Sequence, residues 1–454
     1  MTASTPHAAP DSAHALRAEL PAARIASLAD PGSAHFLPPA GASPHLARYG
    51  IAARDDDGIA IARVRVHGAP ILVAAQDEHY LAGSVGERHG KALQSMIAAA
   101  QTERPSAIVL LLASGGVRLH EANAAELALA RVLSALLDAR VGGIAVLAIG
   151  AGNVFGGTSV LACAADRLAL LPGTRFGLSG PKVLESVHGK WELDAEDMRD
   201  VDAVFGAEAR NAAGLAELVA DDVDTLRAWI ASAARERVDF PGAVMAMHQR
   251  LRARLAGAVT HAPPFVALTC FEGAAPVDEP ARLWRRRECW LTRPHSGAML
   301  GAADAHALDD ALLTHLLAAR KRERTPLVLV EDSAGHVVSR AAEMRLISQF
   351  LAHHAAVLAL LRSRGRRLVG LLAGTGHSAA FFANALQAPR LYALEGARVV
   401  AMEPSAVARV TGLPARDLIE NDPLLGQPVR HFAAQGGVAA IIPDASLTAL
   451  GIGT

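Results

Sequence analysis

Cysteine, lysine and aromatic residues are scarce in this chain of 454 residues, and the first two scarcities exclude classes of protein. The three cysteines are too widely spaced for a disulfide framework or a zinc knuckle. The lysines are Lys91, Lys182, Lys190 and Lys321. None lies in the Met-Lys pair of a biotinyl or lipoyl carrier domain, nor in a P-loop. Aromatic residues contribute only 4%, so the hydrophobic content of 51% comes largely from alanine.

The chain also lacks an excess of charge and long apolar runs. Its 44 basic and 45 acidic residues give a formal net charge of −1. The sequence therefore lacks the excess of positive charge that is typical of proteins that bind nucleic acid. No uncharged apolar run is long enough for a bilayer, and residues 1–21 lack the pattern of a signal peptide. We therefore expect a cytoplasmic protein that binds neither nucleic acid nor membrane. The histidine and cysteine spacings predict no metal site, and the high apolar content is compatible with a homo-oligomer.

What the sequence does contain is an ordered series of strands, turns and helices in its first half. An apolar strand is predicted at 107–113, and it ends in the turn 114–116. A helix follows at 120–137. A second strand at 143–149 then enters a glycine-rich turn at 150–157.

The second half repeats this order, which predicts an internal duplication. Strands are predicted at 327–331 and 368–372, a helix at 341–361, and a second glycine-rich turn at 373–380. At an offset of 223 residues, Arg167, Leu168, Gly173, Arg175 and Pro181 fall on Arg390, Leu391, Gly396, Arg398 and Pro404. Such repeated units indicate an α/β fold with helices covering the sheets.

Composition suggests where the two repeats begin and end. The alanine- and proline-rich residues 1–22 are predicted to form a flexible tail, followed by a first domain at 23–255. The proline-containing stretch 256–288 is predicted to be a linker, and the second domain then occupies 289–454.

The glycine-rich turns are the candidate sites, because ligands in open α/β sheets bind at the carboxyl ends of strands. Glycine lets backbone N–H groups converge, and converging amides can hold an anion or a developing oxyanion. The pairs Gly115-Gly116 and Gly156-Gly157 therefore fit a thioester carbonyl that becomes an enolate. The alternative interpretation is tight packing of helix on strand, which also selects glycine.

Two other interpretations of the second turn remain open. The stretch 374–379 fits a GxGxxA dinucleotide motif, with Glu395 about 20 residues further on. Against this, the corresponding stretch of the first half carries Pro172 where Glu395 would fall. The stretch 376–380 also resembles the elbow of a hydrolase or acyltransferase, in which Ser378 would be the nucleophile. Asp422 and His431 follow in the order that such a triad needs.

Several polar residues neighbour these turns. His120, His336 and His377 each lie next to one, although a lone histidine is more often a surface or core residue. Arg118 and Glu121 follow the first turn and could hold a substrate carboxylate and a proton. An ion pair at the start of the helix explains them equally well.

Taken together, these motifs resemble the crotonase-like carboxyltransferase superfamily. Over 23–238 the chain is most similar to the beta subunit of biotin-independent malonate decarboxylase. The motifs on which this resemblance rests are Gln76-Asp77, Gly83-Ser84-Val85-Gly86-Glu87, Ser114-Gly115-Gly116-Val117-Arg118-Leu119, Glu121-Ala122-Asn123, Asp30-Pro31-Gly32-Ser33, Ser43-Pro44-His45-Leu46, Phe155-Gly156-Gly157 and Gly177-Leu178-Ser179-Gly180-Pro181. Over 369–410 the second half resembles the gamma subunit of the same enzyme, so the chain resembles a beta–gamma fusion. The motifs there are Ser378-Ala379-Ala380-Phe381, Leu386-Gln387-Ala388-Pro389-Arg390 and Ala408-Arg409-Val410.

The resemblance implies two crotonase-like ββα spiral domains in tandem, packed face to face with the site between them. It implies decarboxylation of a malonyl thioester to an acetyl thioester on an acyl carrier protein. The chain itself would bind no cofactor, because the carrier bears the phosphopantetheine-type or phosphoribosyl-dephospho-CoA group. An alpha-type transferase subunit would be a further partner.

The resemblance also assigns roles to residues. Gly115, Gly116, Gly156 and Gly157 would form one oxyanion hole, and Ser378 and Ala379 its counterpart. His377 is the candidate proton donor from its place in the turn, although the family pattern usually lacks a histidine there. The substrate-binding residues would be Ser114, Arg118, Glu121 and Gly376.

Three positions depart from the family pattern. Ala379 replaces a glycine, Lys182 an acid and Ser179 an asparagine. These departures are compatible with a different carrier. They also leave open a non-catalytic scaffold that binds a carrier protein.

Overall fold

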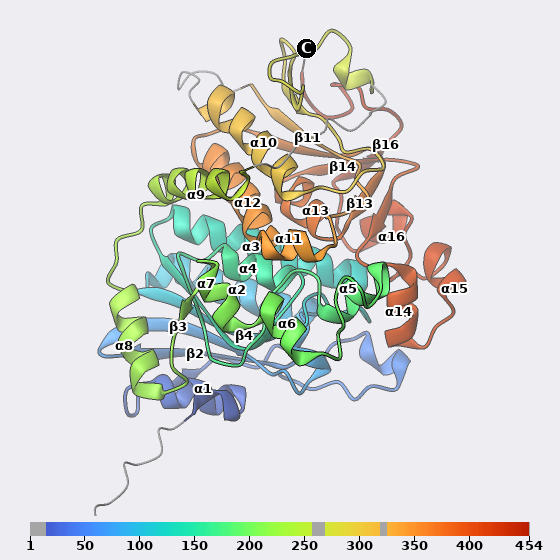
Figure 1. Cartoon of the computed structure of the whole chain (residues 1–454). Helices are drawn as coiled ribbons and strands as arrows, with labels where there is room; N and C mark the ends of the chain where they lie inside the picture. Colours follow the sequence, from blue (N-terminus) through green and yellow to red (C-terminus); the bar gives the residue numbers. More distant parts are fainter. Residues whose placement is uncertain (1–14, 257–267, 318–324, 454) are drawn as a thin grey trace, which may run out of the picture.

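Two α/β units, each built on a seven-stranded sheet, make up the computed structural model (Figure 1). The structure describes residues 15–256, 268–317 and 325–453. In Figure 1 the first unit is coloured from blue to green and the second from yellow to red. The second unit lies above the first in this view.

The first sheet has the order β1-β2-β3-β4-β5-β6-β7. Its strands are β1 (His35–Phe36), β2 (Ile59–Val66), β3 (Ala69–Gln76), β4 (Ala107–Ser114), β5 (Ala145–Val154), β6 (Arg167–Leu170) and β7 (Glu217–Leu218). The pairs β1–β2 and β2–β3 are antiparallel, and all later pairs are parallel. β4 is buried along its whole length, which explains its unbroken apolar sequence.

The second sheet has the order β16-β14-β12-β11-β10-β9-β8. Its strands are β8 (Ala275–Pro276), β9 (Leu283–Arg285), β10 (Trp290–Thr292), β11 (Leu327–Glu331), β12 (Leu368–Leu372), β14 (Leu391–Leu394) and β16 (Ala440–Ile442). The first two pairs are again antiparallel and the other four parallel. The same strand order and direction in both sheets support the predicted duplication. Strands β13 (Thr375–His377) and β15 (Arg398–Val400) form a separate parallel pair.

Helices cover both faces of the first sheet. Apolar side chains of α1 (Pro21–Leu28) and α8 (Val223–Ala233) pack on one face, and those of α2 (Glu87–Glu103) and α3 (Ala122–Val141) on the other. In the second unit, α10 (Ala302–Leu312) and α12 (Ile347–Ser363) cover the face turned toward the first unit. The remaining helices are α4 (Gly157–Cys163), α5 (Pro181–His188), α6 (Met198–Phe205), α7 (Ala207–Ala212), α9 (Phe240–Arg254), α11 (Arg340–Met344), α13 (Ser378–Ala383), α14 (Pro404–Thr411), α15 (Ala415–Glu420) and α16 (Val429–Ala434).

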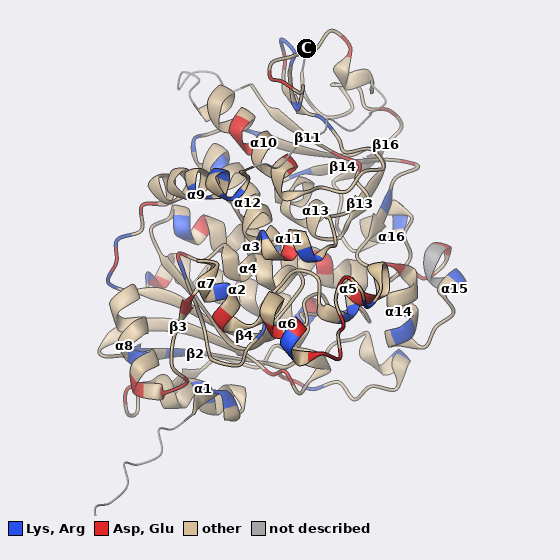
Figure 2. Cartoon of the chain, in the orientation of Figure 1, with Lys and Arg blue, Asp and Glu red and all other residues tan. Residues whose placement is uncertain are grey.

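The two units share one hydrophobic core, in which α3 and α4 pack against α12. Within this core the hydroxyl groups of Ser159 and Ser348 lie 2.7 Å apart. The buried Glu343 carboxylate of α11 accepts the amide of Ser179 at 2.6 Å and pairs with Arg210 at 3.2 Å. Figure 2 shows charges of both signs where α11 meets α6, and there Arg340 binds Asp200 at 2.6 Å. These polar contacts fix how the two units face each other.

Some boundaries differ from the sequence-based prediction. β5 continues to Val154 rather than turning at residue 150, because its last residues still pair with Ser114 of β4. The helix predicted at 341–361 is two helices, since Leu346 between them has a left-handed φ of 64°.

The packed structure also extends into the predicted tail and linker. Leu16 is fully buried and α1 begins at Pro21, so the packed first unit includes part of the predicted tail. β8 and β9 lie within the predicted linker but pair into the second sheet. Residues 1–14 and 257–267 of these two segments lie outside the described part of the chain.

Candidate active site between the two halves

A cleft between the two units brings the two glycine-rich turns together. It holds about 1110 Å³ of empty space, including the part open to solvent. Six predicted site residues line it, namely Gly115, Gly156, Gly157, His377, Ser378 and Ala379. Val117, Leu119, Val183 and Phe382 make much of the remaining wall apolar. The structure therefore has a cavity between the two halves, where the site was predicted to lie.

Gly116 and Gly156 are where the two turns of the first half touch. Their φ angles are +100° and +61°, in the region that favours glycine. A Cβ on Gly116 would lie 3.0 Å from the Gly156 Cα and 3.1 Å from the Phe155 oxygen. Close backbone packing thus explains these two glycines, as the alternative interpretation held.

The hydrogen bonds show which of the predicted amides are free. The N–H of Gly115 donates to Ala82 O at 2.8 Å, that of Gly116 to Ser114 Oγ at 3.1 Å, and that of Gly156 to Leu178 O at 3.0 Å. These three are therefore not available as oxyanion donors. In the described part of the chain the N–H of Gly157 has no acceptor, and neither has that of Ala379. Both residues lie in the first turn of a short helix, α4 and α13 respectively.

Two residues predicted to bind substrate shape the turns instead. Ser114 is 1% exposed, and its hydroxyl lies 3.0 Å from Thr158 Oγ1 as well as accepting the Gly116 amide. Gly376 lies in β13, where a Cβ would come within 2.8 Å of the Phe381 ring. Neither lines the cleft.

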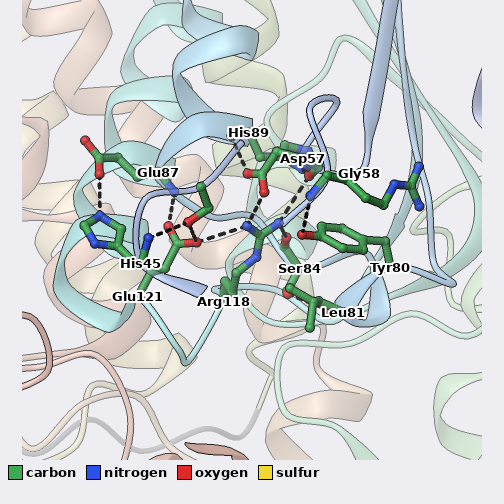
Figure 3. Close-up of polar contacts among 12 residues, drawn as sticks. His45, Asp57, Gly58, Tyr80, Leu81, Ser84, Glu87, His89, Arg118 and Glu121 are labelled. Atoms are coloured by element: carbon green, nitrogen blue, oxygen red, sulfur yellow. Dashed lines mark hydrogen bonds and ion pairs between the residues drawn. The ribbon is translucent and has the colours of Figure 1, made fainter. Parts of the chain in front are cut away.

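Arg118 and Glu121 do not fit the substrate-binding role either (Figure 3). Both side chains are fully buried and lie 3.0 Å apart. Arg118 also binds Asp57 at 2.6 Å, and Glu121 accepts the amide of Glu87 at 2.6 Å and the hydroxyl of Ser43 at 2.8 Å. The pair at the start of the helix therefore holds the first unit together behind the cleft.

The geometry does not form the hydrolase triad. Ser378 lines the cleft, but Asp422 binds Arg48 and His431 Nε2 lies 3.0 Å from Glu420 O. Within the described ranges no hydrogen bond joins Ser378 to a histidine.

The dinucleotide interpretation fails as well. Residues 375–377 of the motif form the strand β13 instead of a turn, and α13 has only six residues. The space beside Gly374 is filled, because a Cβ there would lie 2.2 Å from Asp332 Oδ1.

Two of the three histidines near the turns line the cleft. Burial, together with the neighbouring His377, lowers the pKa of His336 to about 4. Burial also lowers the pKa of His377, against the effect of Glu403, whose Oε1 lies 3.7 Å from His377 Nε2. Both rings are therefore neutral near pH 7. His120 packs edge-on against Tyr49 at a centroid distance of 5.2 Å, away from the cleft.

Sequence reasoning missed Glu126, a cleft residue on α3. It is 2% exposed, and its Oε2 has no hydrogen-bond partner in the described structure. Burial raises the pKa of Glu126 to about 8, and the Glu331 carboxylate adds to the rise. The available signal was an acid that interrupts the alanine and leucine residues of 124–130 in the predicted helix.

Among the described residues, no group of three or more histidine, cysteine, aspartate or glutamate side chains could hold a metal ion. Nor does that part of the chain contain a helix long and apolar enough to cross a membrane.

Comparison with known proteins agrees with this two-part architecture. Residues 14–241 match the carboxyl transferase domain, and residues 296–450 match the malonate decarboxylase gamma subunit. The malonyl-S-ACP:biotin-protein carboxyltransferase of Malonomonas rubra is 33% identical over 202 residues, which are 41% of this chain and 63% of that protein. An acetyl-coenzyme A carboxylase carboxyl transferase of Saccharopolyspora erythraea is 30% identical over 39% of this chain and 34% of its own length. The chain thus spans less than two thirds of either relative.

A solved structure extends the likeness. A chain of a Pseudomonas malonate decarboxylase hetero-tetramer, crystallised with malonate, is 31% identical with a TM-score of 0.51. The match covers 56% of the present chain and 95% of that one. The predicted fold class, two crotonase-like domains in tandem, is confirmed. The chain therefore belongs to the carboxyl transferase family, with a domain of the malonate decarboxylase gamma-subunit type joined to the first in one polypeptide.

Proposed function

We propose that this protein decarboxylates a malonyl thioester, carried on an acyl carrier protein, to an acetyl thioester. One observation carries the proposal most directly. The cleft is lined from its two sides by Gly157 and Ala379, whose amides have no acceptor among the described residues. Oxyanions that develop on a substrate in the cleft would satisfy such donors.

The chemistry fits such a cleft. When the bond from C2 to the carboxylate breaks, its electrons move into an enolate whose charge rests on the thioester oxygen. An oxyanion-hole amide contributes about 2.7–4 kcal/mol to such a step. The apolar walls solvate a carboxylate poorly, which favours its loss as neutral CO₂. A proton must then reach C2, and His377 is the donor predicted from the sequence.

The entrance of the cleft would accommodate the arm of a carrier protein. Val187 and Met299 line the cleft and are 53% and 48% exposed. An apolar, accessible rim suits a phosphopantetheine-type or phosphoribosyl-dephospho-CoA arm. The carrier protein and an alpha-type transferase subunit are the partners we propose. Relatives include a subunit of a malonate decarboxylase hetero-tetramer.

Carboxyl transfer to a biotin-bearing protein is the second candidate function. The Malonomonas rubra relative is named for that reaction, and it shares the malonyl-S-ACP substrate proposed here. The two functions differ only in the fate of the carboxyl group.

Mass spectrometry of the thioester separates these functions from hydrolysis and from a scaffold role. The purified chain would be mixed with malonyl-CoA and with malonyl on an acyl carrier protein. We expect conversion of malonyl to acetyl without any biotin-bearing acceptor. Conversion only when such an acceptor is added would favour carboxyl transfer, and free malonate would favour hydrolysis. Tight carrier binding with an unchanged malonyl group would favour a scaffold.

Replacing the candidate nucleophile gives a further test. The variant Ser378→Ala should keep its activity within a few-fold of the wild type, because decarboxylation needs no nucleophile at this position. A fluorophosphonate should likewise fail to label Ser378. Loss of turnover by about 10⁴-fold or more, together with labelling, would support the serine mechanism instead.

A further inference from the structure

A carboxyl group that lacks any hydrogen-bond partner for one oxygen lies in the wall of the cleft. Glu126 projects from α3 in a stretch whose neighbours Ala125 and Leu127 are buried and apolar. It lines the same cleft as Gly157 and Ala379, although only 2% of its surface is exposed. Such burial is costly for a carboxyl group without partners, so its presence there needs an explanation.

The charged group that acts on Glu126 from across the interface is Glu331, at the end of β11. The Glu331 carboxylate accepts Ser333 Oγ at 2.8 Å and Asn384 Nδ2 at 2.7 Å. Asn384 is itself held by His354, whose other ring nitrogen lies 2.6 Å from Asp309. Burial raises the pKa of Glu331 to about 7, but its ionised form is stabilised by two donors. Glu126 Oε2 has none, so of the two groups Glu126 is the one that keeps a proton.

We propose that Glu126 is the catalytic acid that protonates C2 of the enolate after CO₂ has left. The inference rests on the proposed decarboxylation. The enolate electron pair forms the new C–H bond at C2, and the electrons of the broken O–H bond stay on Glu126. Water then reprotonates the Glu126 carboxylate, so each turnover consumes one proton and converts malonyl to acetyl.

The other titratable groups of the cleft suit this step less well. His336 and His377 are neutral near pH 7, because burial lowers the pKa of each ring. A neutral imidazole is a very weak acid. The Glu403 side chain is 66% exposed and lies at the rim beside His377. Glu126 is both enclosed in the wall and protonated, as a general acid requires.

The proposed role gives the activity a definite pH dependence. Burial and Glu331 raise the pKa of Glu126 to about 8, and the protonated form is the active one. Activity should therefore hold below about pH 8 and fall as the pH rises through this value. The matched variant Glu331→Gln leaves Glu126 in place but removes the charge that raises its pKa. Its alkaline limb should lie at lower pH than that of the wild type.

The deciding experiment compares Glu126→Gln, Glu126→Leu and Glu126→Asp in the full chain, by rate of acetyl formation, pH profile and Tm. We expect Glu126→Gln to be about 10²–10⁴-fold slower, without the wild-type alkaline limb. Glu126→Asp should recover part of the rate. Glu126→Leu should be inactive, yet melt no lower than the wild type, because it removes a buried carboxyl without partners.

Three outcomes would overturn the inference. In one, Glu126→Gln keeps the wild-type rate and alkaline limb. In another, the loss of activity in Glu126→Leu and Glu126→Gln is matched by a fall in Tm. Glu126 would then have a structural role. In the third, Glu126→Asp recovers no part of the rate. If the wild type itself forms no acetyl thioester, the proposed function fails, so the two failures are distinguishable.

Discussion

The variant Gly157→Pro should decarboxylate the malonyl thioester about 10²–10³-fold more slowly than Gly157→Ala, which is the loss expected when one oxyanion donor is removed. Gly157 is the first residue of α4, where proline is well tolerated. Its N–H has no acceptor in the described structure, so proline breaks no internal hydrogen bond there. The measurement is kcat for the two variants side by side.

The alanine variant is the matched control, because both side chains introduce the same Cβ. That atom would lie 2.5 Å from Leu129 Cδ2, so Leu129 must shift in both variants. Only proline also removes the N–H. Equal rates in the two variants would show that the Gly157 amide takes no part in the reaction.

The variant Arg118→Leu should lose about 3–5 kcal/mol of unfolding free energy, although Arg118 lies outside the cleft. Arg118 is fully buried and is the cation between the buried carboxylates of Asp57 and Glu121. Burial raises the pKa of Asp57 and Arg118 lowers it, so removing the cation raises it further. A raised folded-state pKa costs stability as the pH rises, so the deficit should be larger at pH 7 than at pH 4.

An exposed arginine provides the control for this measurement. The Arg199 side chain is 96% exposed, and Arg199→Leu should change the unfolding free energy by no more than about 0.5 kcal/mol. Denaturant titrations of both variants give the comparison. A stable Arg118→Leu protein with raised KM would instead restore the substrate-binding role predicted from the sequence.

The sequence predicts best the elements whose signal is local. The strands at 327–331 and 368–372 are β11 and β12 to the residue, because each is a short buried run bounded by turn residues. The repeat predicts that the two sheets are alike, and the resemblance places the site between them. The end of β5 depends on pairing with Ser114, a contact that no local pattern contains.

The roles of the site residues were harder to predict, because they depend on contacts with residues that are distant in the sequence. Gly115, Gly116 and Gly157 look equivalent in the sequence, yet of these three only Gly157 has an N–H without an acceptor among the described residues. Arg118 looks like a substrate ligand until Asp57, 61 residues away, is found bound to it. Glu126 is an acid in an apolar stretch of α3, and its importance depends on the cleft that the second half closes over it.

Decarboxylation in D₂O is the most direct test of the proposed reaction. Each malonyl thioester should yield one CO₂ and one acetyl thioester, with a single deuterium added to the methyl group. Mass spectrometry of the thioester and quantification of CO₂ would establish this ratio. A malonyl group that stays intact, or that leaves as free malonate without CO₂, would show that this protein is not a decarboxylase.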